Sequence, residues 1–416
     1  MKSFYFVLYS VALWALAGCD SGPKPLPVIN ADHPSGSIEL ALSDILEDIR
    51  IVPLETTDAS LVTSGGSSIM FVTDRYIIAS GTDKVLLFDK DGRYLKSILN
   101  KGNGPNEYQY LNGLLMDEVH DILYYRDPMK RESIYRLSLP EIKYLDPFVP
   151  TVERFNPLRI DAQGRMYGFP VSAVLRIGGE NPEKPDSTSS VLLLRQDPSD
   201  NSLQSFSGHR PYQIQSTGLS MALYRENLHF FNFSYSDTLF RLSQDKLQPL
   251  GVFSLQNRMK RLEAVSAEGD DLRLLYAYRN GIVMQTVHTG LDISHDSAGE
   301  ISSISVRNHT VGVYHFDHQG HFQTLKKLYI DPLALEVDVE TFFSNQREGR
   351  SNPISPMLQT SGNWGYIVVD ALNIMDLMQN ALDQNKLSSA QRKSLEGVLA
   401  QLEEDSNSVL ILGRIK

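Results

Sequence analysis

Residues 83–108 read D-K-V-L-L-F-D-K-D-G-R-Y-L-K-S-I-L-N-K-G-N-G-P-N-E-Y, and this stretch decides the fold. It opens with a short apolar run at 84–88 that favours extended structure, and residues 94–99 form a second such run. Between the two runs, D-K-D-G supplies turn chemistry because Gly92 can take a positive φ. The stretch therefore predicts a β-hairpin followed by a glycine-rich loop.

Weaker copies of this hairpin recur down the chain. Equivalent positions in the copies are separated by 49, 57, 48 and 74 residues, and these positions are Phe88, Leu137, Leu194, Leu242 and Phe316. A unit of roughly 45–50 residues made of short strands is typical of propeller blades with four strands each. A β-sandwich of unrelated hairpins is the alternative, but about four strands per repeat weigh against it.

The two ends of the chain together supply a sixth unit. Residues 364–369 and 409–416 are strand-like, and residues 49–56 can lie against the last strand as the outer edge of the same blade. Closing a ring with strands from both termini removes the exposed edge that an open array would leave. We therefore expect an all-β, six-bladed β-propeller over residues 37–416, closed by its N- and C-terminal strands.

The hydrophobic period changes near the C-terminus. Residues 370–382 have a helical pattern, and Ser388 followed by Gln391 is typical of a capping box. An apolar helix face follows at Leu395, Val398, Leu399 and Leu402. We expect a short helical insertion at about residues 370–404 that packs on the side of the propeller, with docking of a partner as the alternative. Three polar segments are expected to be loop insertions, at residues 181–190, 257–269 and 288–300.

The first residues carry the features of an export signal. Lys2 is the only charge before an apolar run at 4–17, which is too short to span a bilayer comfortably. The sequence L-A-G-C at 16–19 resembles the lipobox of bacterial lipoproteins, in which the chain is cut before a cysteine that is then lipidated. An ordinary signal peptide with a chance cysteine is the alternative.

We therefore expect residues 1–18 to be a lipoprotein signal peptide and Cys19 to be the lipidation site that attaches the protein to the membrane. Residues 19–36 are rich in proline and low in apolar residues, which predicts a flexible tether. Because Cys19 is the only cysteine, a disulfide framework is excluded.

Four motifs together resemble a known family. They are the lipobox, I-V-P-L-E-T-T at 51–57, K-G-N-G-P-N-E-Y at 101–108 and S-D-T-L-F-R-L at 236–242. In these motifs the chain is similar to the six-bladed β-propeller lipoproteins of Bacteroidota, which are related in architecture to NHL-repeat propellers. The resemblance covers roughly residues 49–416 and departs where N-S-V at 407–409 replaces the usual Asn-Pro-Val. It implies a fold and a place in the cell envelope more than an activity.

Composition and motifs limit the chemistry that we expect. The 39 Lys and Arg residues against 50 Asp and Glu residues give a net charge of −11 without a basic stripe, which disfavours nucleic acid as a partner. The loop at 102–105 lacks the Lys-Ser/Thr of a phosphate-binding loop, so we expect it to link two blades. His315, His318 and His321 flank a turn and should not converge, so no metal site and no cofactor are expected. Familiar catalytic motifs are missing too, but a site built from several blades would leave none.

A ligand site is expected at one mouth of the ring. In a propeller, the loops between blades and those between second and third strands gather on the same face. The candidate residues there are Tyr108, Tyr110, Arg126, Arg131, Arg210, Tyr212, Asn232, Tyr235 and His309. Aromatic and Arg side chains suit a sugar or peptide, although the same side chains can also fasten loops together. The sequence thus predicts a binding or scaffold module for a glycan, peptide or envelope-protein partner, and the alternative is an envelope glycan hydrolase or lyase.

Overall fold

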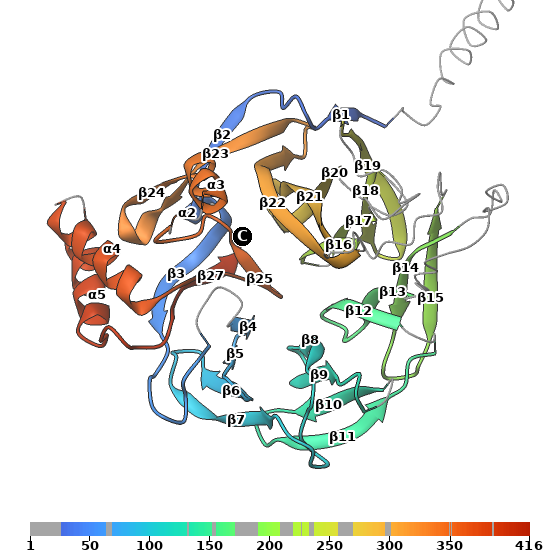
Figure 1. Ribbon diagram of the computed structural model, residues 1–416, viewed down its shortest axis with the longest axis horizontal. Coiled ribbons are helices and arrows are strands. Elements are labelled where there is room, and N and C mark those ends of the chain that lie inside the picture. The colour runs from blue at the N-terminus through green and yellow to red at the C-terminus, as the bar shows by residue number, and fades with distance from the viewer. Residues whose placement is uncertain are drawn as a thin grey trace, which may run out of the picture.

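The computed structural model describes residues 26–416, except for residues 64–68, 131–132, 152–154, 171–189, 209–218, 226, 233–236, 257–268, 296–300, 349, 351 and 385–386. Six sheets stand around a central axis and form a β-propeller (Figure 1). Each sheet has a core of four strands that pair in order from the axis outward, which confirms the predicted fold.

In the first five blades, the four strands follow one another along the chain. Blade 1 contains β4 (Ile69–Val72), β5 (Tyr76–Ser80), β6 (Lys84–Asp89) and β7 (Tyr94–Asn100). Blade 2 contains β8 (Asn112–Asp117), β9 (Ile122–Arg126), β10 (Ile134–Ser138) and β11 (Lys143–Phe148). Blade 3 contains β12 (Phe155–Ile160), β13 (Met166–Pro170), β14 (Ser190–Gln196) and β15 (Leu203–Gly208). Blade 4 contains β16 (Leu219–Tyr224), β17 (Asn227–Asn232), β18 (Thr238–Ser243) and β19 (Lys246–Ser254). Blade 5 contains β20 (Gly269–Tyr278), β21 (Gly281–His295), β22 (Ile301–Asp317) and β23 (Phe322–Ile330).

The repeat found in the sequence corresponds to one strand of each of these blades. The five aligned positions lie in β6, β10, β14, β18 and β22, which are the third strands of blades 1 to 5. Four of the five side chains have no more than 4% of their surface exposed and Phe316 has 6%. The third strand is recognisable in the sequence because it is covered on both faces by neighbouring blades.

Blade 6 closes the ring with both ends of the chain. It contains β25 (Gln359–Ser361), β26 (Trp364–Val369), β27 (Val409–Ile415) and, as the outer strand, β3 (Leu46–Pro53). The pairing of β3 with β27 is antiparallel and places Ile51 opposite Ile411. The predicted closure is therefore confirmed.

Two further N-terminal strands lie outside the core strands of neighbouring blades. β1 (Val28–Asn30) pairs in parallel with β19, and β2 (Ser37–Ala41) pairs in parallel with β23, before α2 (Leu42–Ile45) leads into β3. The expected flexible tether to residue 36 is wrong for β1, because its backbone bonds to an open sheet edge and Ile29 is buried there. The polar composition of the segment hid this short strand.

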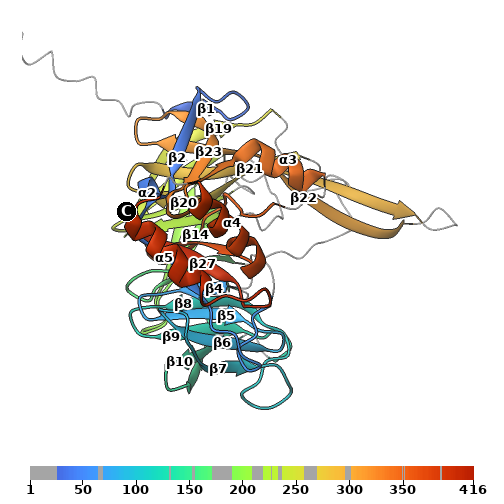
Figure 2. The ribbon, with the colours of Figure 1, turned by 90° about the vertical axis from the view of Figure 1, so that its left-hand side faces the viewer.

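The expected loop at 288–300 is also wrong over most of its length. β21 and β22 stay paired as far as His295 and Ile301, and their hairpin projects well beyond the ring (Figure 2). A hairpin that leaves the core satisfies its backbone hydrogen bonds internally, so it needs no alternation of apolar residues. The other two expected insertions lie almost wholly outside the described residues.

Helices occur in the connections that flank β25 and β26. The predicted insertion is confirmed as α4 (Ala371–Asp383) and α5 (Ser389–Leu399), and the Gln391 N–H donates to the Ser388 hydroxyl at the start of α5. Ile374 and Met378 of α4 are fully buried in the core that includes β27, so the helices cover the side of blade 6. The segment before β25 holds η1 (Asp331–Leu333), β24 (Leu335–Asp338) and α3 (Val339–Arg347), which were not predicted. Over the described residues, each helix is either too short or too polar to cross a bilayer.

The strand order gives the propeller two distinct faces. The loops between blades and those between second and third strands lie on one face, which we call the linker face. The turns between first and second strands, and those between third and fourth strands, lie on the opposite face, which we call the turn face. The long hairpin and the segments containing α3, α4 and α5 all begin on the linker face.

Candidate functional site

Four of the predicted site residues are described with their side chains, and all four belong to the linker face. Tyr108 and Tyr110 lie in the loop between blades 1 and 2, Arg126 ends β9, and His309 lies on β22. Asn232 ends β17 on the same face, but its side chain is outside the described residues. Arg131, Arg210, Tyr212 and Tyr235 are outside them altogether.

A buried carboxylate organises the loop that carries the two tyrosines. Asp127 is fully buried at the start of the connection between β9 and β10. It accepts hydrogen bonds from the backbone N–H groups of Gln109 at 2.7 Å, Tyr110 at 3.3 Å and Met129 at 3.1 Å. The bond to Met129 is a local turn of the kind that Asp favours, and Pro128 helps to fix it.

The glycine-rich loop is fastened to the same connection. The ammonium of Lys130 donates to the carbonyls of Gly104, at 3.0 Å, and Glu107. The carboxylate of Glu107 accepts from the Gly104 N–H at 2.8 Å and lies so close to Gly102 that a Cβ there would come within 2.1 Å of it. The loop therefore links blades 1 and 2, as its sequence predicts.

The two tyrosines of this loop have opposite environments. Tyr108 has 7% of its surface exposed and packs in the core shared by blades 1 and 2, where burial raises its pKa. Tyr110 is 57% exposed and Met129 is 69% exposed. Because the backbone N–H groups of Tyr110 and Met129 bond to the same oxygen of Asp127, the backbones of these two exposed residues lie close together. We call this pair the mouth platform.

Arg126 and His309 do not join Tyr110 in one site. The Arg126 guanidinium donates to the Phe155 carbonyl at 3.3 Å and so fastens blade 2 to blade 3. His309 lies on blade 5, on the opposite side of the six-bladed ring from blade 2. Its ring centre is 5.0 Å from that of His288, which is itself 2.7 Å from Asp270. Desolvation first, and then the neighbouring His288, lower the pKa of His309.

The histidines at 315, 318 and 321 have three separate partners. His315 bonds to the Tyr278 hydroxyl at 3.0 Å, His318 to the Arg279 carbonyl at 2.8 Å and His321 to Asp317 at 2.8 Å. In the part of the chain that the structure describes, no three His, Cys, Asp or Glu side chains are arranged to hold a metal ion.

Another cluster of charged groups lies on the turn face, where blades 6, 1 and 2 meet. The Trp364 indole N–H donates to Asp74 at 2.9 Å, and Arg414 pairs with the same oxygen of Asp74 at 3.0 Å. Burial, assisted by the charge of Asp74, raises the pKa of Glu118 to about 8, although Arg414 opposes this. Glu118 also lies against the turn at Gly362, where a Cβ would come within 2.1 Å of its carboxyl oxygen.

This cluster gives the turn face a carboxyl group with a raised pKa close to a second carboxyl group. Below pH 8 Glu118 is protonated, while Asp74 is held by an arginine and an indole N–H. Such a pair has the chemical capacity for proton transfer. The sequence contains no signal for it, because the residues come from turns far apart in the chain.

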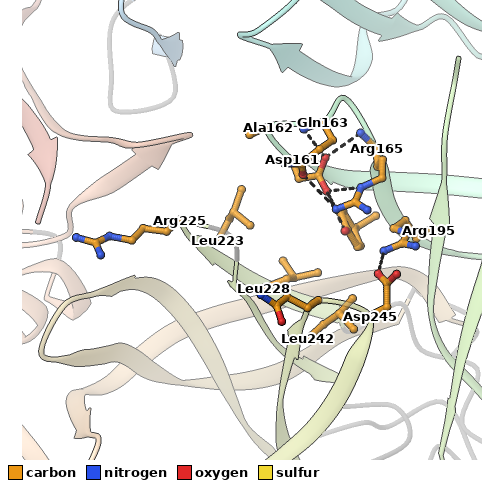
Figure 3. Close-up of a pocket in the computed structure, with 12 residues that line it drawn as sticks. Asp161, Ala162, Gln163, Arg165, Arg195, Leu223, Arg225, Leu228, Leu242 and Asp245 are labelled. Carbon is orange, nitrogen blue, oxygen red and sulfur yellow. Dashed lines mark hydrogen bonds and ion pairs between the residues drawn. The ribbon is translucent and has the colours of Figure 1, made fainter.

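A small pocket lies between blades 3 and 4, also on the turn face (Figure 3). Asp161 accepts hydrogen bonds from Arg165 at 2.8 Å and from the Tyr167 hydroxyl at 2.9 Å, and Arg195 pairs with Asp245. The volume is about 30 Å³, enough for one water molecule. Because its charged groups are mostly paired with one another, we interpret it as a joint between blades.

Comparisons with known proteins agree with the fold. The family model described as "Domain of unknown function (DUF4934)" matches residues 26–414. A Bacteroides fragilis protein of known structure, provisionally described as exported, is 15% identical and has a TM-score of 0.50. The match covers 94% of this chain and 99% of that chain, and it shows a shared fold. A member of the duf4221 family from Bacteroides vulgatus is 10% identical with a TM-score of 0.42, covering 89% of this chain and 97% of that chain. No curated protein is significantly similar to the sequence.

Proposed function

We propose, from the premise that this chain belongs to the DUF4934 family, that it is a lipid-anchored binding module of the bacterial cell envelope. Its ligand, a glycan or a peptide, binds on the linker face of the propeller. The observation that carries the proposal is the mouth platform, in which the buried Asp127 accepts hydrogen bonds from the backbone N–H groups of two exposed residues, Tyr110 and Met129.

Two observations support the location. The sequence L-A-G-C at 16–19 follows an apolar run with a single preceding charge, which is the pattern of a lipoprotein signal. A structure that shares the fold belongs to a Bacteroides protein provisionally described as exported. A lipidated Cys19 then attaches the propeller to a membrane surface.

The chemistry of the mouth platform supports a role in binding. Large apolar side chains that stay exposed on a fixed backbone gain free energy when a ligand covers them, at about 25 cal/mol per Å² of apolar surface. A tyrosine ring that stacks on a sugar or a peptide side chain, together with a methionine, therefore contributes on the order of 2–4 kcal/mol. Because Asp127 fixes the backbone beforehand, little of this gain is lost to ordering the loop.

Binding to an array of envelope glycans and peptides tests the proposal. The fragment that starts at Asp20 should bind at least one class, and Tyr110→Ala should weaken that binding about tenfold, which corresponds to 1.4 kcal/mol. Val119→Ala is the matched control, because Val119 is 58% exposed but lies on the turn face. If both variants lose ligand affinity equally, or if Tyr110→Ala binds as tightly as the unchanged protein, the mouth platform is not the binding surface.

A second candidate function is supported by the Glu118 and Asp74 pair. A carboxyl group that keeps its proton near neutral pH, close to a second carboxyl group, is what an acid-catalysed glycan hydrolase needs. If this function holds, purified protein releases reducing ends from an envelope glycan, and Glu118→Gln abolishes the release while leaving array binding intact. Cleavage that survives in Glu118→Gln would exclude this pair as the catalytic site.

A further inference from the structure

The short strand β1 fixes the place at which the chain joins the propeller. It pairs in parallel with β19, the outer core strand of blade 4, and Val28 lies opposite Val252. The Val252 N–H donates to the Pro27 carbonyl at 2.9 Å. Ile29 is buried in the core that blades 4 and 5 share. Backbone pairing and an apolar side chain together hold the chain at the rim of blade 4 from Pro27 onward.

The direction of β1 shows from which side the chain arrives. β19 begins at the turn that joins it to β18, on the turn face, and runs toward the linker face. At the linker end of this pairing, the Ala31 N–H donates to the Ser254 carbonyl at 2.9 Å. Because β1 runs parallel to β19, the chain enters β1 from the turn-face side of the rim.

The pairing of β1 also limits the distance between Cys19 and the propeller. Eight residue steps separate Cys19 from Pro27. Because an extended chain covers at most about 3.5 Å per step, these residues span no more than about 28 Å in any conformation. Without β1, the first paired strand would be β2, which begins at Ser37, eighteen steps after Cys19. The limit would then be about 63 Å, so β1 reduces it by more than half.

The projecting hairpin of blade 5 is longer than this limit. β21 has 15 residues, whereas β17, the second strand of the neighbouring blade 4, has 6. At about 3.4 Å per residue, the nine additional residues extend about 30 Å beyond the linker face (Figure 2). If the linker face were turned toward a bilayer, the hairpin would hold the rim of blade 4 farther away than the chain from Cys19 can reach.

We propose that the turn-face side of the blade 4 rim faces the lipid headgroups of the membrane, and that the linker face points away from the bilayer. This inference rests on the lipidated Cys19 of the proposed function and adds the orientation of the whole molecule. It leaves the mouth platform open to glycans and peptides. The length of the connection, rather than charge, sets this orientation, so it is expected on a neutral membrane.

Energy transfer to headgroup dyes tests the orientation. The full chain, processed and lipidated at Cys19, is reconstituted in phosphatidylcholine vesicles that carry the acceptor dye. Because the lipid occupies the only natural cysteine, one introduced cysteine carries the donor dye. Lys246→Cys places the donor at the turn-face end of β19, whereas Asn106→Cys and Ser294→Cys place it on the linker side. Transfer should be at least threefold more efficient from position 246 than from either of the other two.

Variants test whether β1 sets this orientation. Ile29→Asp should release β1 and lower the transfer from position 246 at least twofold. Val28→Asp is the matched control, because the neighbouring Val28 is 73% exposed, and it should leave the transfer unchanged. Eight Gly and Ser residues inserted after Gly22 lengthen the connection without changing β1, and they should have the same effect as Ile29→Asp. Thermal unfolding checks that each variant is folded.

Flotation of the vesicles separates the two ways in which the proposal can fail. If the unchanged protein does not float with the vesicles, lipid anchoring is wrong and the orientation is wrong with it. If the protein floats but position 106 or 294 transfers as efficiently as position 246, the anchor stands and the orientation alone is overturned. The role of β1 is overturned if Ile29→Asp and Val28→Asp give equal transfer, or if the insertion has no effect.

Discussion

At the scale of single residues, exposure rather than residue type separates the candidate site from the structure that supports it. Tyr108 and Tyr110 are two positions apart in one loop, yet only Tyr110 faces solvent. The difference is set by Asp127, whose carboxylate reaches back to residues 17 and 18 positions earlier. A sequence can indicate that a loop carries tyrosines, but it cannot indicate which distant carboxylate holds the backbone.

Glu118 yields a prediction about pH at this scale. Its pKa is about 8 in the folded protein against 4.5 for an ordinary glutamate, so the folded state keeps a proton that the unfolded chain loses between these values. The protonated carboxyl of Glu118 therefore stabilises the folded state to its full extent below pH 4.5, and this stabilisation is lost as the pH rises to 8. Compared with Glu118→Gln, the unchanged protein should lose about 3 kcal/mol of unfolding free energy between pH 5 and pH 8.

Urea unfolding at a series of pH values measures this difference. A second readout is the fluorescence of Trp364, which shares Asp74 with the cluster and is the only tryptophan in a fragment that begins at Asp20. The signal should change with a midpoint near pH 8 and stay flat in Glu118→Gln. Parallel pH profiles for the two proteins would show that Glu118 titrates normally.

At the scale of elements, one buried side chain adds to the strand pairing that joins the two ends of the chain. The Asn407 amide donates to the carbonyls of Glu55 at 2.8 Å and Ser60 at 2.9 Å, and its oxygen accepts from the Val62 N–H at 2.9 Å. Asn407 itself is 6% exposed. It thus connects the segment just before β27 to the segment just after β3.

Removing this side chain leaves three polar backbone groups without their partner. Asn407→Ala should therefore lower the free energy of unfolding by about 2–3 kcal/mol, measured by urea denaturation. Asn106→Ala, in an exposed part of the loop between blades 1 and 2, is the control and should change it by less than about 0.5 kcal/mol. If the two variants are equally stable, Asn407 does not hold the joint.

The elements that the sequence predicts well are those buried on both faces. The third strands, which contain Phe88 in blade 1 and Leu137 in blade 2, repeat visibly because burial on both faces demands a continuous apolar run. β1 and the outer half of the β21 and β22 hairpin were missed, because their pairing relies on backbone hydrogen bonds that leave little trace in side-chain pattern.

At the scale of the whole molecule, closure of the ring depends on β3. This strand covers β27, whose residues Leu410 and Leu412 are fully buried between blade 6 and blade 1. Without β3, the outer edge of blade 6 is unpaired and part of this core is exposed to solvent. The fold class and the closure were predictable because both termini carry strong strand patterns.

Truncation tests this dependence. A fragment of residues 54–416 should lose cooperative unfolding, whereas residues 32–416, which lack only β1, should still unfold cooperatively at a lower melting temperature. Circular dichroism during heating separates the two outcomes, and a synthetic peptide of residues 37–56 should restore the transition to the shorter fragment. A fully cooperative transition in residues 54–416 alone would show that the ring does not need β3.

The candidate site is less predictable at this scale, because a ring brings together residues from blades that are distant in sequence. Arg126 and His309 both belong to the linker face, yet they lie on opposite sides of the axis and form no common site.

Oxidation of Met129 by hydrogen peroxide, followed by mass spectrometry, tests most directly whether the mouth platform binds the ligand. With a saturating amount of the glycan or peptide identified on the array, Met129 should oxidise several-fold more slowly, while the partly buried Met357 and Met375 should keep their rates. If Met129 oxidises at the same rate with the ligand bound, the ligand lies elsewhere and the proposed binding surface is wrong.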